Sequence, residues 1–349
     1  MARGSRRRRQ GLATTPLLSA VAVFLASAAV SLPLPATGGD LSVDFHADSC
    51  PQLERIVRTA VEAALHSEIA LAAGLLRIFF HDCFPQGCDA SVLLRGAGTE
   101  QAMAPNTRLQ PRALQLIEDV RAKVHDACGP TVSCADIAAL ATRDAVVASG
   151  GPAYAVPLGQ LDSLAPAAAA DVNALPTPST AAVHDLLAAF RSRGLNKTAD
   201  LVALAGAHTV GRARCASFAD RAARQDDAFA KKLAARCSRD PDRLQHLDVR
   251  TPDAFDNAYF VDLVDEQGVF TSDMALVRNQ STARIVRKYA KSKDAFFKRF
   301  AKSMVKLCKV PRKPPGNVGE IRRSCFSTNA QSILEFDVHK VAGAEGVSA

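Results

Sequence analysis

An arginine and a histidine lie four residues apart in a segment rich in reactive side chains. They are Arg77 and His81, and Phe80 lies beside them. If this segment is helical, the two side chains share one face, so a cation and an imidazole converge on one pocket. Such a pair suits a reaction that needs a general base and then a positive charge beside an oxygen that becomes negative. Cleavage of a peroxide bond is one reaction of this kind.

Oxygen-bearing side chains follow the histidine around a tight turn. Asp82, Asp89 and Ser91 supply the oxygens, and Cys83 and Cys88 are close enough to close the loop with a disulfide. Hard oxygen ligands in a rigid loop suit calcium. The same histidine, aspartate and cysteines also offer zinc-ligand types, but disulfide formation in an exported protein disfavours that alternative. A structural histidine and a solvated acidic turn are the plainer interpretations, and the clustering disfavours both.

A second histidine ends an apolar run. His208 follows this run and directly precedes Thr209. We interpret it as a residue that faces a buried cofactor. An iron-ligating histidine needs an acceptor for its other ring nitrogen. Asp273 is one candidate, but the residues alone do not select it among the other acidic side chains. An acidic cluster from Asp248 to Asp256 suggests a second calcium site near Thr209.

The elements that position these residues are predicted to be helices. Apolar side chains recur at helical spacing over 53–65, 183–190 and 296–307, with Ser179 and Thr180 as start signals for the second helix. Alternation with a period of two is scarce, so the fold should be mainly helical. The loop from 150 to 178 is too long for a simple connector and is expected to line a site.

The N-terminus has the layout of a secretory signal peptide. A basic run over 6–9 precedes an apolar stretch over 17–30 and then small residues, which places cleavage near 36–40. A membrane anchor is the alternative, but the stretch is shorter than the roughly 20 residues that span a bilayer. The leader contains five arginines, so its removal lowers the formal charge from +8 to about +3 (8 − 5 = 3). Nucleic-acid binding therefore gains no support.

The cysteine count fits an exported protein. Nine cysteines in an oxidising route indicate disulfides with one cysteine left over. The sequons at Asn196 and Asn279 become acceptor sites for glycans once export is accepted.

Several segments together resemble the signatures of secretory plant (class III) haem peroxidases. They are residues 77–84 with 87–91, 132–136, 205–211 and 319–325, and the resemblance runs from about Leu41 to Asn329. It implies an all-α haem peroxidase fold, in which two helical lobes enclose one haem b, with few or no short strands. The implied organisation is a signal peptide over 1–38, a peroxidase domain over 39–329 and a tail over 330–349.

The resemblance assigns roles to residues near the haem. It makes His81 the acid and base, Arg77 the cation, Phe80 the residue at the haem edge and Asn106 the partner that orients His81. It makes His208 the axial iron ligand and Asp273 the acceptor behind it. Pro176 is assigned to the binding of aromatic donors.

The resemblance also implies two calcium ions and four disulfides. The distal ion takes side chains of Asp82, Asp89 and Ser91, carbonyls of Asp82, Pro85 and Gly87, and Glu100 through water. The proximal ion takes Thr209, Asp248, Thr251, the carbonyl of Ala254, and Asp256. The disulfides are Cys50–Cys128, Cys83–Cys88, Cys134–Cys325 and Cys215–Cys237, which leaves Cys308 free. This cysteine is unusual for the family, and we interpret it as buried and inert, with a mixed disulfide as the alternative.

The implied function is the one-electron oxidation of small phenolic donors by hydrogen peroxide. The partners are these small molecules, with no nucleic acid and no membrane for the mature monomer, which is expected outside the cell, in the cell wall or in a vacuole. A secreted haem- and calcium-binding wall protein with little turnover is the alternative. A hydrolase is disfavoured because the chain has no nucleophile elbow. Departures from the family are Pro85, Gln160–Leu161, Gln110–Pro111 and the absence of tryptophan.

Overall fold

The computed structural model describes Met1, residues 36–37, 40–313 and 315–333. The chain divides into the units Met1–Leu34 and Pro35–Ala349, and every described residue except Met1 belongs to the second. The predicted signal peptide lies outside the described residues apart from Met1 and residues 36–37. Residues 334–349 of the predicted tail also lie outside them. Among the described residues, no helix combines the length and apolarity needed to cross a bilayer.

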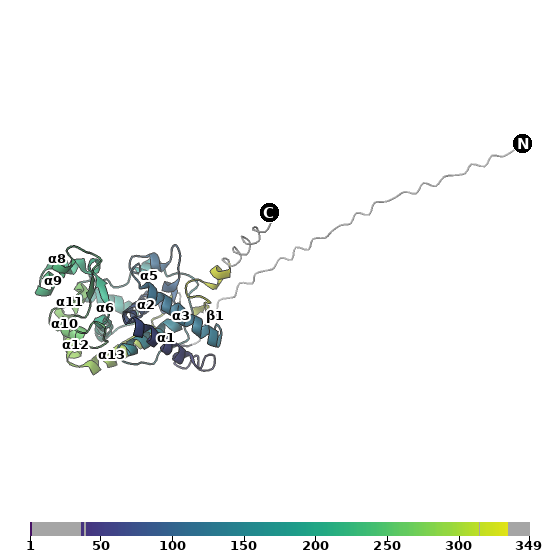
Figure 1. Cartoon of the computed structure of the whole chain (residues 1–349), viewed down its shortest axis with the longest axis horizontal. Helices are drawn as coiled ribbons and strands as arrows, with labels where there is room; N and C mark the ends of the chain where they lie inside the picture. Colours follow the sequence, from purple (N-terminus) through teal and green to yellow (C-terminus); the bar gives the residue numbers. More distant parts are fainter. Residues whose placement is uncertain (2–35, 38–39, 314, 334–349) are drawn as a thin grey trace. The chain divides into compact units, whose positions relative to one another are not determined.

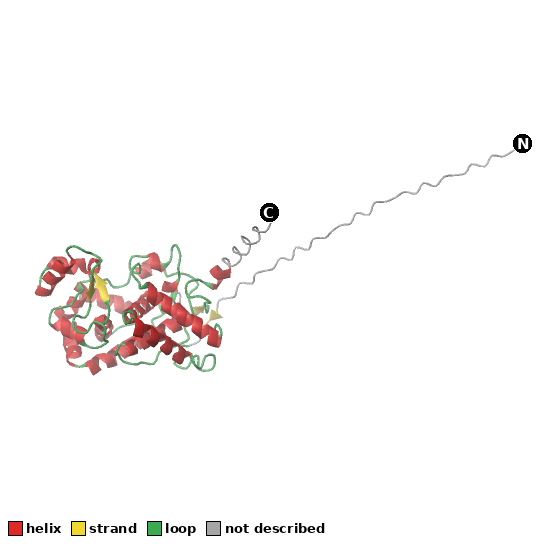
Figure 2. Ribbon diagram, viewed as in Figure 1, coloured by secondary structure: helices red, strands yellow, loops and turns green. Residues whose placement is uncertain are grey.

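Helices dominate the described chain, as the apolar spacing predicts (Figure 2). The α-helices are α1 (Leu53–Ser67), α2 (Leu71–Gln86), α3 (Pro111–Cys128), α4 (Cys134–Ala148), α5 (Ala169–Val172), α6 (Val183–Ser192), α7 (Thr198–Ala205), α8 (Ala219–Arg224), α9 (Ala228–Cys237), α10 (Ala258–Val264), α11 (Thr271–Arg278), α12 (Gln280–Lys291) and α13 (Lys293–Cys308). Short 3₁₀ helices are η1 (Ser91–Leu93), η2 (Glu100–Ala102), η3 (Gly206–Thr209) and η4 (Cys215–Phe218).

The described strands are two or three residues long and pair in two small antiparallel sheets. They are β1 (Ala36–Thr37) with β4 (Val318–Gly319), and β2 (Arg212–Arg214) with β3 (Leu244–His246). In the second pair, Arg212 lies opposite His246. This register holds the chain just after His208 beside the chain just before Asp248, which are the two segments of the predicted proximal calcium site.

Each predicted apolar stripe forms a helix, although one helix begins later than expected. The stripe over 183–190 becomes α6, which begins at Val183 and not at the start signals Ser179 and Thr180. The hydroxyls of Ser179 and Thr180 both hydrogen-bond to Thr177 Oγ1, at 3.1 and 2.9 Å. These two residues therefore stabilise the turn before the helix and leave its first turn uncapped.

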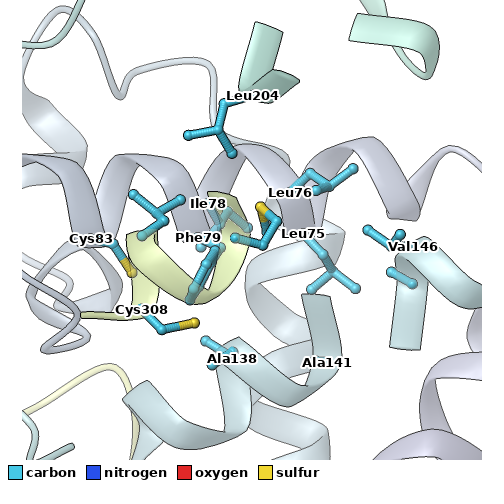
Figure 3. Close-up of a cluster of buried hydrophobic side chains, with 14 of the residues drawn as sticks. Leu75, Leu76, Ile78, Phe79, Cys83, Ala138, Ala141, Val146, Leu204 and Cys308 are labelled. Atoms are coloured by element: carbon cyan, nitrogen blue, oxygen red, sulfur yellow. The ribbon is translucent and has the colours of Figure 1, made fainter. Parts of the chain in front are cut away.

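Helix α2 carries the first reactive segment and is anchored by one apolar face. Leu75, Ile78 and Phe79 lie in a buried cluster with residues of α4, α7 and α13 (Figure 3). The helix also packs against α3 (Figure 1). Arg77 and His81 are on the other face, which is not enclosed by this cluster. Burial of the apolar face therefore fixes the direction in which the arginine and histidine point.

Candidate active site

A cavity of about 1140 Å³ contains the residues that the sequence singled out. Arg77, Phe80 and His81 line it from α2, and His208 lines it from η3. Pro176 lines it from the long loop, as expected for that loop. The volume slightly exceeds the roughly 300–1,000 Å³ of ordinary ligand pockets, so the cavity suits a large cofactor together with a small substrate.

Hydrogen bonds fix the side chains of Arg77 and His81 in α2. Arg77 donates from its terminal nitrogens to the carbonyls of Arg108 (3.2 Å) and Pro105 (3.1 Å), and its Nε lies 3.4 Å from His81 Nε2. His81 Nδ1 lies 2.6 Å from Asn106 Oδ1. Because an amide oxygen only accepts, the proton of a neutral His81 must reside on Nδ1. Its Nε2 then keeps a lone pair beside the guanidinium and can act as a base.

The surroundings of His81 favour the neutral imidazole. Burial lowers the pKa of His81 to about 4, the positive charge of Arg77 acts in the same direction, and the bond to Asn106 opposes both only in part. A base must be unprotonated before it reacts. His81 therefore meets this requirement at any pH well above 4.

This pKa predicts the pH dependence of the reaction with peroxide. The bimolecular rate constant should stay nearly constant from neutral pH to about pH 5 and halve near pH 4, because protonated His81 accepts no proton. Stopped-flow measurements from pH 4 to pH 7 check this rate constant. An inflection near pH 6.5 would show that His81 titrates as it does in water.

The same depressed pKa affects the stability of the fold. Between about pH 4 and pH 6.5 the unfolded chain binds more protons at His81 than the folded chain does, so this residue's contribution to stability falls as the pH drops through that range.

Apolar rings border the cavity beside His81. Phe80 stacks on Phe84 with ring centroids 4.8 Å apart, and both approach Phe190 of α6. Phe80 is half-buried and lines the cavity, whereas Phe84 is buried. An aromatic donor that enters the cavity would therefore meet an apolar, aromatic surface.

His208 has only one ring nitrogen left for a ligand. Its Nδ1 lies 2.9 Å from Asp273 Oδ1, so the N–H donates to a carboxylate that is 2% exposed. The remaining nitrogen is Nε2, and the side chain is 35% exposed and lines the cavity. A carboxylate behind an imidazole fixes the ring and increases its electron donation to a metal. These residues fit a site in which Nε2 of His208 would hold a haem iron and Asp273 would orient the ring.

The backbone near His208 leaves no space for a side chain at Gly206. A Cβ there would lie 2.5 Å from the Phe296 ring and 2.8 Å from the Phe260 ring, both fully buried. Gly206→Ala should therefore cost about 1–3 kcal/mol of unfolding free energy and disturb His208, two residues away. Urea unfolding checks the cost, and Phe296→Leu in the same chain should recover part of it. Unchanged stability of Gly206→Ala would contradict this packing argument.

The segment from Asp82 to Glu100, which follows His81, contains buried oxygen atoms without hydrogen-bond partners. Asp82 Oδ1, Ser91 Oγ and Glu100 Oε2 are buried and accept or donate no hydrogen bond. Burial raises the pKa of Asp82 well above its usual range, and the carboxylate of Asp89 raises it further. Burial also raises the pKa of Asp89 and of Glu100. Unpaired oxygens and crowded carboxylates are the features that a bound cation would relieve, so these residues fit calcium.

The second oxygen cluster connects His208 to the later loop. Thr209 Oγ1 donates to Asp248 Oδ2 at 2.9 Å, and Thr251 Oγ1 donates to Asp256 Oδ1 at 3.1 Å. Ala254 is in the same loop. In the described part of the chain, no three His, Cys, Asp or Glu side chains alone form a metal cage. Both proposed sites therefore depend on hydroxyl and carbonyl oxygens as well, including those of Pro85 and Gly87.

The structure contains four disulfides and one free thiol among the described residues. The pairs are those that the resemblance implies: Cys50–Cys128, Cys83–Cys88, Cys134–Cys325 and Cys215–Cys237. Cys308 is free and belongs to the buried cluster of Figure 3. Burial raises the pKa of its thiol to about 12, which disfavours the reactive thiolate. This placement agrees with the interpretation of Cys308 as an inert core residue.

Gln160, where the sequence departs from the family pattern, makes two hydrogen bonds that connect separate elements. The side chain of Gln160 donates to the Cys308 carbonyl at 2.9 Å, and its backbone N–H donates to Asp136 Oδ1. Asp136 also bonds His46 Nε2 at 2.8 Å. These contacts connect the long loop to α4 and to the end of α13. The sequence alone offered no role for His46 or Asp136.

Sequence reasoning also missed a residue beside His208. The Tyr259 hydroxyl donates to Asp273 Oδ1 at 2.8 Å, the same oxygen that accepts the His208 N–H. A tyrosine in an apolar helix is usually a core residue, and only the spatial contact distinguishes this one.

Comparisons with known proteins give one consistent result. A sequence model of the family described as peroxidase matches residues 57–292. The relatives include "Cationic peroxidase SPC4" of Sorghum bicolor, which is 48% identical over 85% of this chain and 84% of that protein. "Peroxidase 12" of Arabidopsis thaliana is 45% identical over 84% of both chains. "Peroxidase 66" of Zea mays is 43% identical over 90% of this chain and 95% of that protein.

Proposed function

The chain belongs to the plant class III peroxidase family and uses hydrogen peroxide to oxidise donor molecules, and we propose that the cavity between His81 and His208 is its active site. The strongest support for this assignment is that two histidines line one cavity and that each has its Nδ1 hydrogen-bonded to a side-chain oxygen. Haem, when bound in this cavity, would supply the redox chemistry of the reaction with hydrogen peroxide.

His81 moves one proton between the two peroxide oxygens. Its Nε2 removes the proton from one oxygen and returns it to the other as the O–O bond breaks, so that oxygen leaves as water. Asn106 supports this transfer because its bond to Nδ1 keeps the lone pair on Nε2. The low pKa of His81 ensures that the base is available.

Arg77 stabilises the negative charge that develops on the departing oxygen. Its guanidinium is held by two backbone carbonyls and lies beside His81 Nε2, so it needs little movement to stabilise this charge during the reaction. The positive charge also opposes protonation of His81 before peroxide arrives.

His208 is proposed to hold the haem iron through Nε2, and Asp273 to accept the proton of Nδ1. Two phenolic donor molecules would then each give one electron and one proton, so that one peroxide yields two waters and two oxidised donors. We assign Phe80 and Pro176 to the edge where small phenolic donors bind, since both line the cavity.

Calcium is proposed at the two oxygen clusters. The distal ion would take side chains of Asp82, Asp89 and Ser91 with the carbonyls of Asp82, Pro85 and Gly87, and Glu100 through water. The proximal ion would take Thr209, Asp248, Thr251, Ala254 and Asp256. Unpaired buried oxygens support the first assignment, and the hydroxyl–carboxylate contacts support the second. Each ion would hold the chain adjacent to one of the two histidines.

Export and processing form a further part of the proposal. The signal peptide over 1–38 would be removed, which leaves a monomeric peroxidase domain over 39–329 in the cell wall or in a vacuole. The four disulfides support an oxidising route.

Consumption of donor against limiting peroxide tests the proposed function. The haem-loaded protein should consume a phenol such as guaiacol in proportion to the peroxide added, and haem-free protein should consume none. A wall protein that binds haem and calcium without turnover would instead leave the phenol unchanged. That result would overturn the assignment of the cavity as an active site.

A further inference from the structure

Asp273 Oδ1 accepts two hydrogen bonds at once. The Nδ1–H of His208 donates to it at 2.9 Å and the hydroxyl of Tyr259 donates to it at 2.8 Å. The other carboxylate oxygen accepts the backbone N–H of Phe270 at 3.1 Å. Asp273 is 2% exposed and Tyr259 is 1% exposed, so water does not compete for these bonds. The imidazole and the phenol therefore share the negative charge of a single oxygen.

The Tyr259 hydroxyl is the donor in its contact with Asp273. Burial raises the pKa of Tyr259 well above its ordinary value, and the carboxylate of Asp273 raises it further. The hydroxyl donates to Asp273 Oδ1, and burial of the phenol favours this protonated, donating form. Its ring lies edge-on to His208, with centroids 5.9 Å apart, and edge-on to Phe260 at 5.0 Å. Packing therefore holds the hydroxyl toward Asp273.

The shared oxygen determines how strongly the carboxylate attracts the imidazole proton. A hydrogen bond to a carboxylate oxygen withdraws charge from it, and in a dry site this effect is large. Without the phenol, Asp273 would draw the Nδ1 proton more strongly and the imidazole would become more negative. A more negative imidazole donates more strongly to iron and stabilises the ferric state.

We propose that Tyr259 is a positioning residue that limits the pull of Asp273 on His208 and thereby raises the reduction potential of the bound haem. The inference rests on the proposed function, in which His208 is the axial iron ligand. Tyr259 needs no contact with haem, peroxide or donor for this role. It acts only through the oxygen that it shares with His208.

Tyr259→Phe tests the inference because it removes the hydroxyl and keeps the ring. The ferric form should become favoured about tenfold over the ferrous form, which corresponds to a potential lower by about 59 mV. The iron–histidine stretching band of the ferrous protein should move to higher frequency. Tyr289→Phe is the matched control, since Tyr289 is also buried but lies in α12 and makes no hydrogen bond to Asp273. It should change neither quantity.

Fluorination of Tyr259 should shift the reduction potential in the opposite direction, and it keeps the Tyr259 hydroxyl. In the Tyr154→Phe/Tyr289→Phe background, Tyr259 is the only tyrosine of the chain, so biosynthetic 3-fluorotyrosine labels it alone. The fluorinated phenol is a stronger donor, and the potential should rise relative to the same background with ordinary tyrosine. A merely structural role for Tyr259 would not give opposite shifts in the two variants.

The outcomes separate the inference from the proposed function. Absence of an iron–histidine band in the parent protein would show that His208 is not the axial ligand, which is a failure of the proposed function. If that band is present and neither the band nor the potential changes in Tyr259→Phe or in the fluorotyrosine protein, Tyr259 does not modulate Asp273. Opposite shifts in the two proteins would support the inference.

Discussion

His81→Gln is expected to slow the reaction with hydrogen peroxide by about a thousandfold. Glutamine keeps a polar side chain of similar length but offers no basic nitrogen, so no group removes the peroxide proton or returns it to the departing oxygen. A general acid–base catalyst contributes about 10²–10⁴ in rate, and His81 is assigned both roles. The bimolecular rate constant with peroxide, measured by stopped flow under saturating donor, gives the effect.

His184→Gln provides the matched control for this prediction. The His184 side chain is 85% exposed, and the residue lies in α6 and does not line the cavity. Its replacement should leave the peroxide reaction unchanged. Both variants should bind haem as the parent does, because neither alters His208. A decrease of less than tenfold in His81→Gln would show that another group carries the proton.

Removal of calcium is expected to cause a large loss of stability. Asp82, Asp89 and Glu100 are buried close together, and without a cation their charges must be neutralised by protons or left unbalanced. A ligand at a thousandfold excess over its Kd stabilises the folded state by about 4 kcal/mol at each site. A chelator should therefore lower the melting temperature by several degrees, and added calcium should restore it.

A variant distinguishes the loss of the distal ion from other effects of the chelator on the melting temperature. Asp82→Asn removes a proposed ligand of the distal ion only, so the chelator should lower its melting temperature less than that of the parent. Asp185→Asn alters an exposed carboxylate in α6 and should respond to the chelator as the parent does. Equal melting temperatures with and without the chelator in the parent would exclude calcium from both clusters.

Much of the fold follows from local pattern. The apolar stripes over 53–65 and 296–307 predict α1 and α13, because a helix with one buried face needs apolar residues at that spacing. Arg77 and His81 share a helical face for the same geometric reason. The start of α6 was not predictable from its start signals, because Ser179 and Thr180 bond with Thr177 in the preceding turn.

The pairing of distant residues did not follow from the residues alone. Asp273 is one of many acidic side chains, and only the fold, or a resemblance to known proteins, brings it to His208. Asn106 lies 25 residues beyond His81 and reaches it because the intervening loop returns to α2. The sequence around Tyr259 did not indicate a role in the site, since a buried tyrosine in a helix looks like an ordinary core residue. Its role depends on a single shared oxygen.

The most direct test of the central claim is the absorption spectrum of the haem-loaded mature protein before and after one equivalent of hydrogen peroxide, with guaiacol added last. We predict a Soret band that shifts with peroxide and returns when the donor is added, because His81, Arg77 and His208 act on one bound haem. Haem that binds but shows no such cycle would contradict the assigned catalytic residues. Failure to bind haem at all would contradict the assignment of His208.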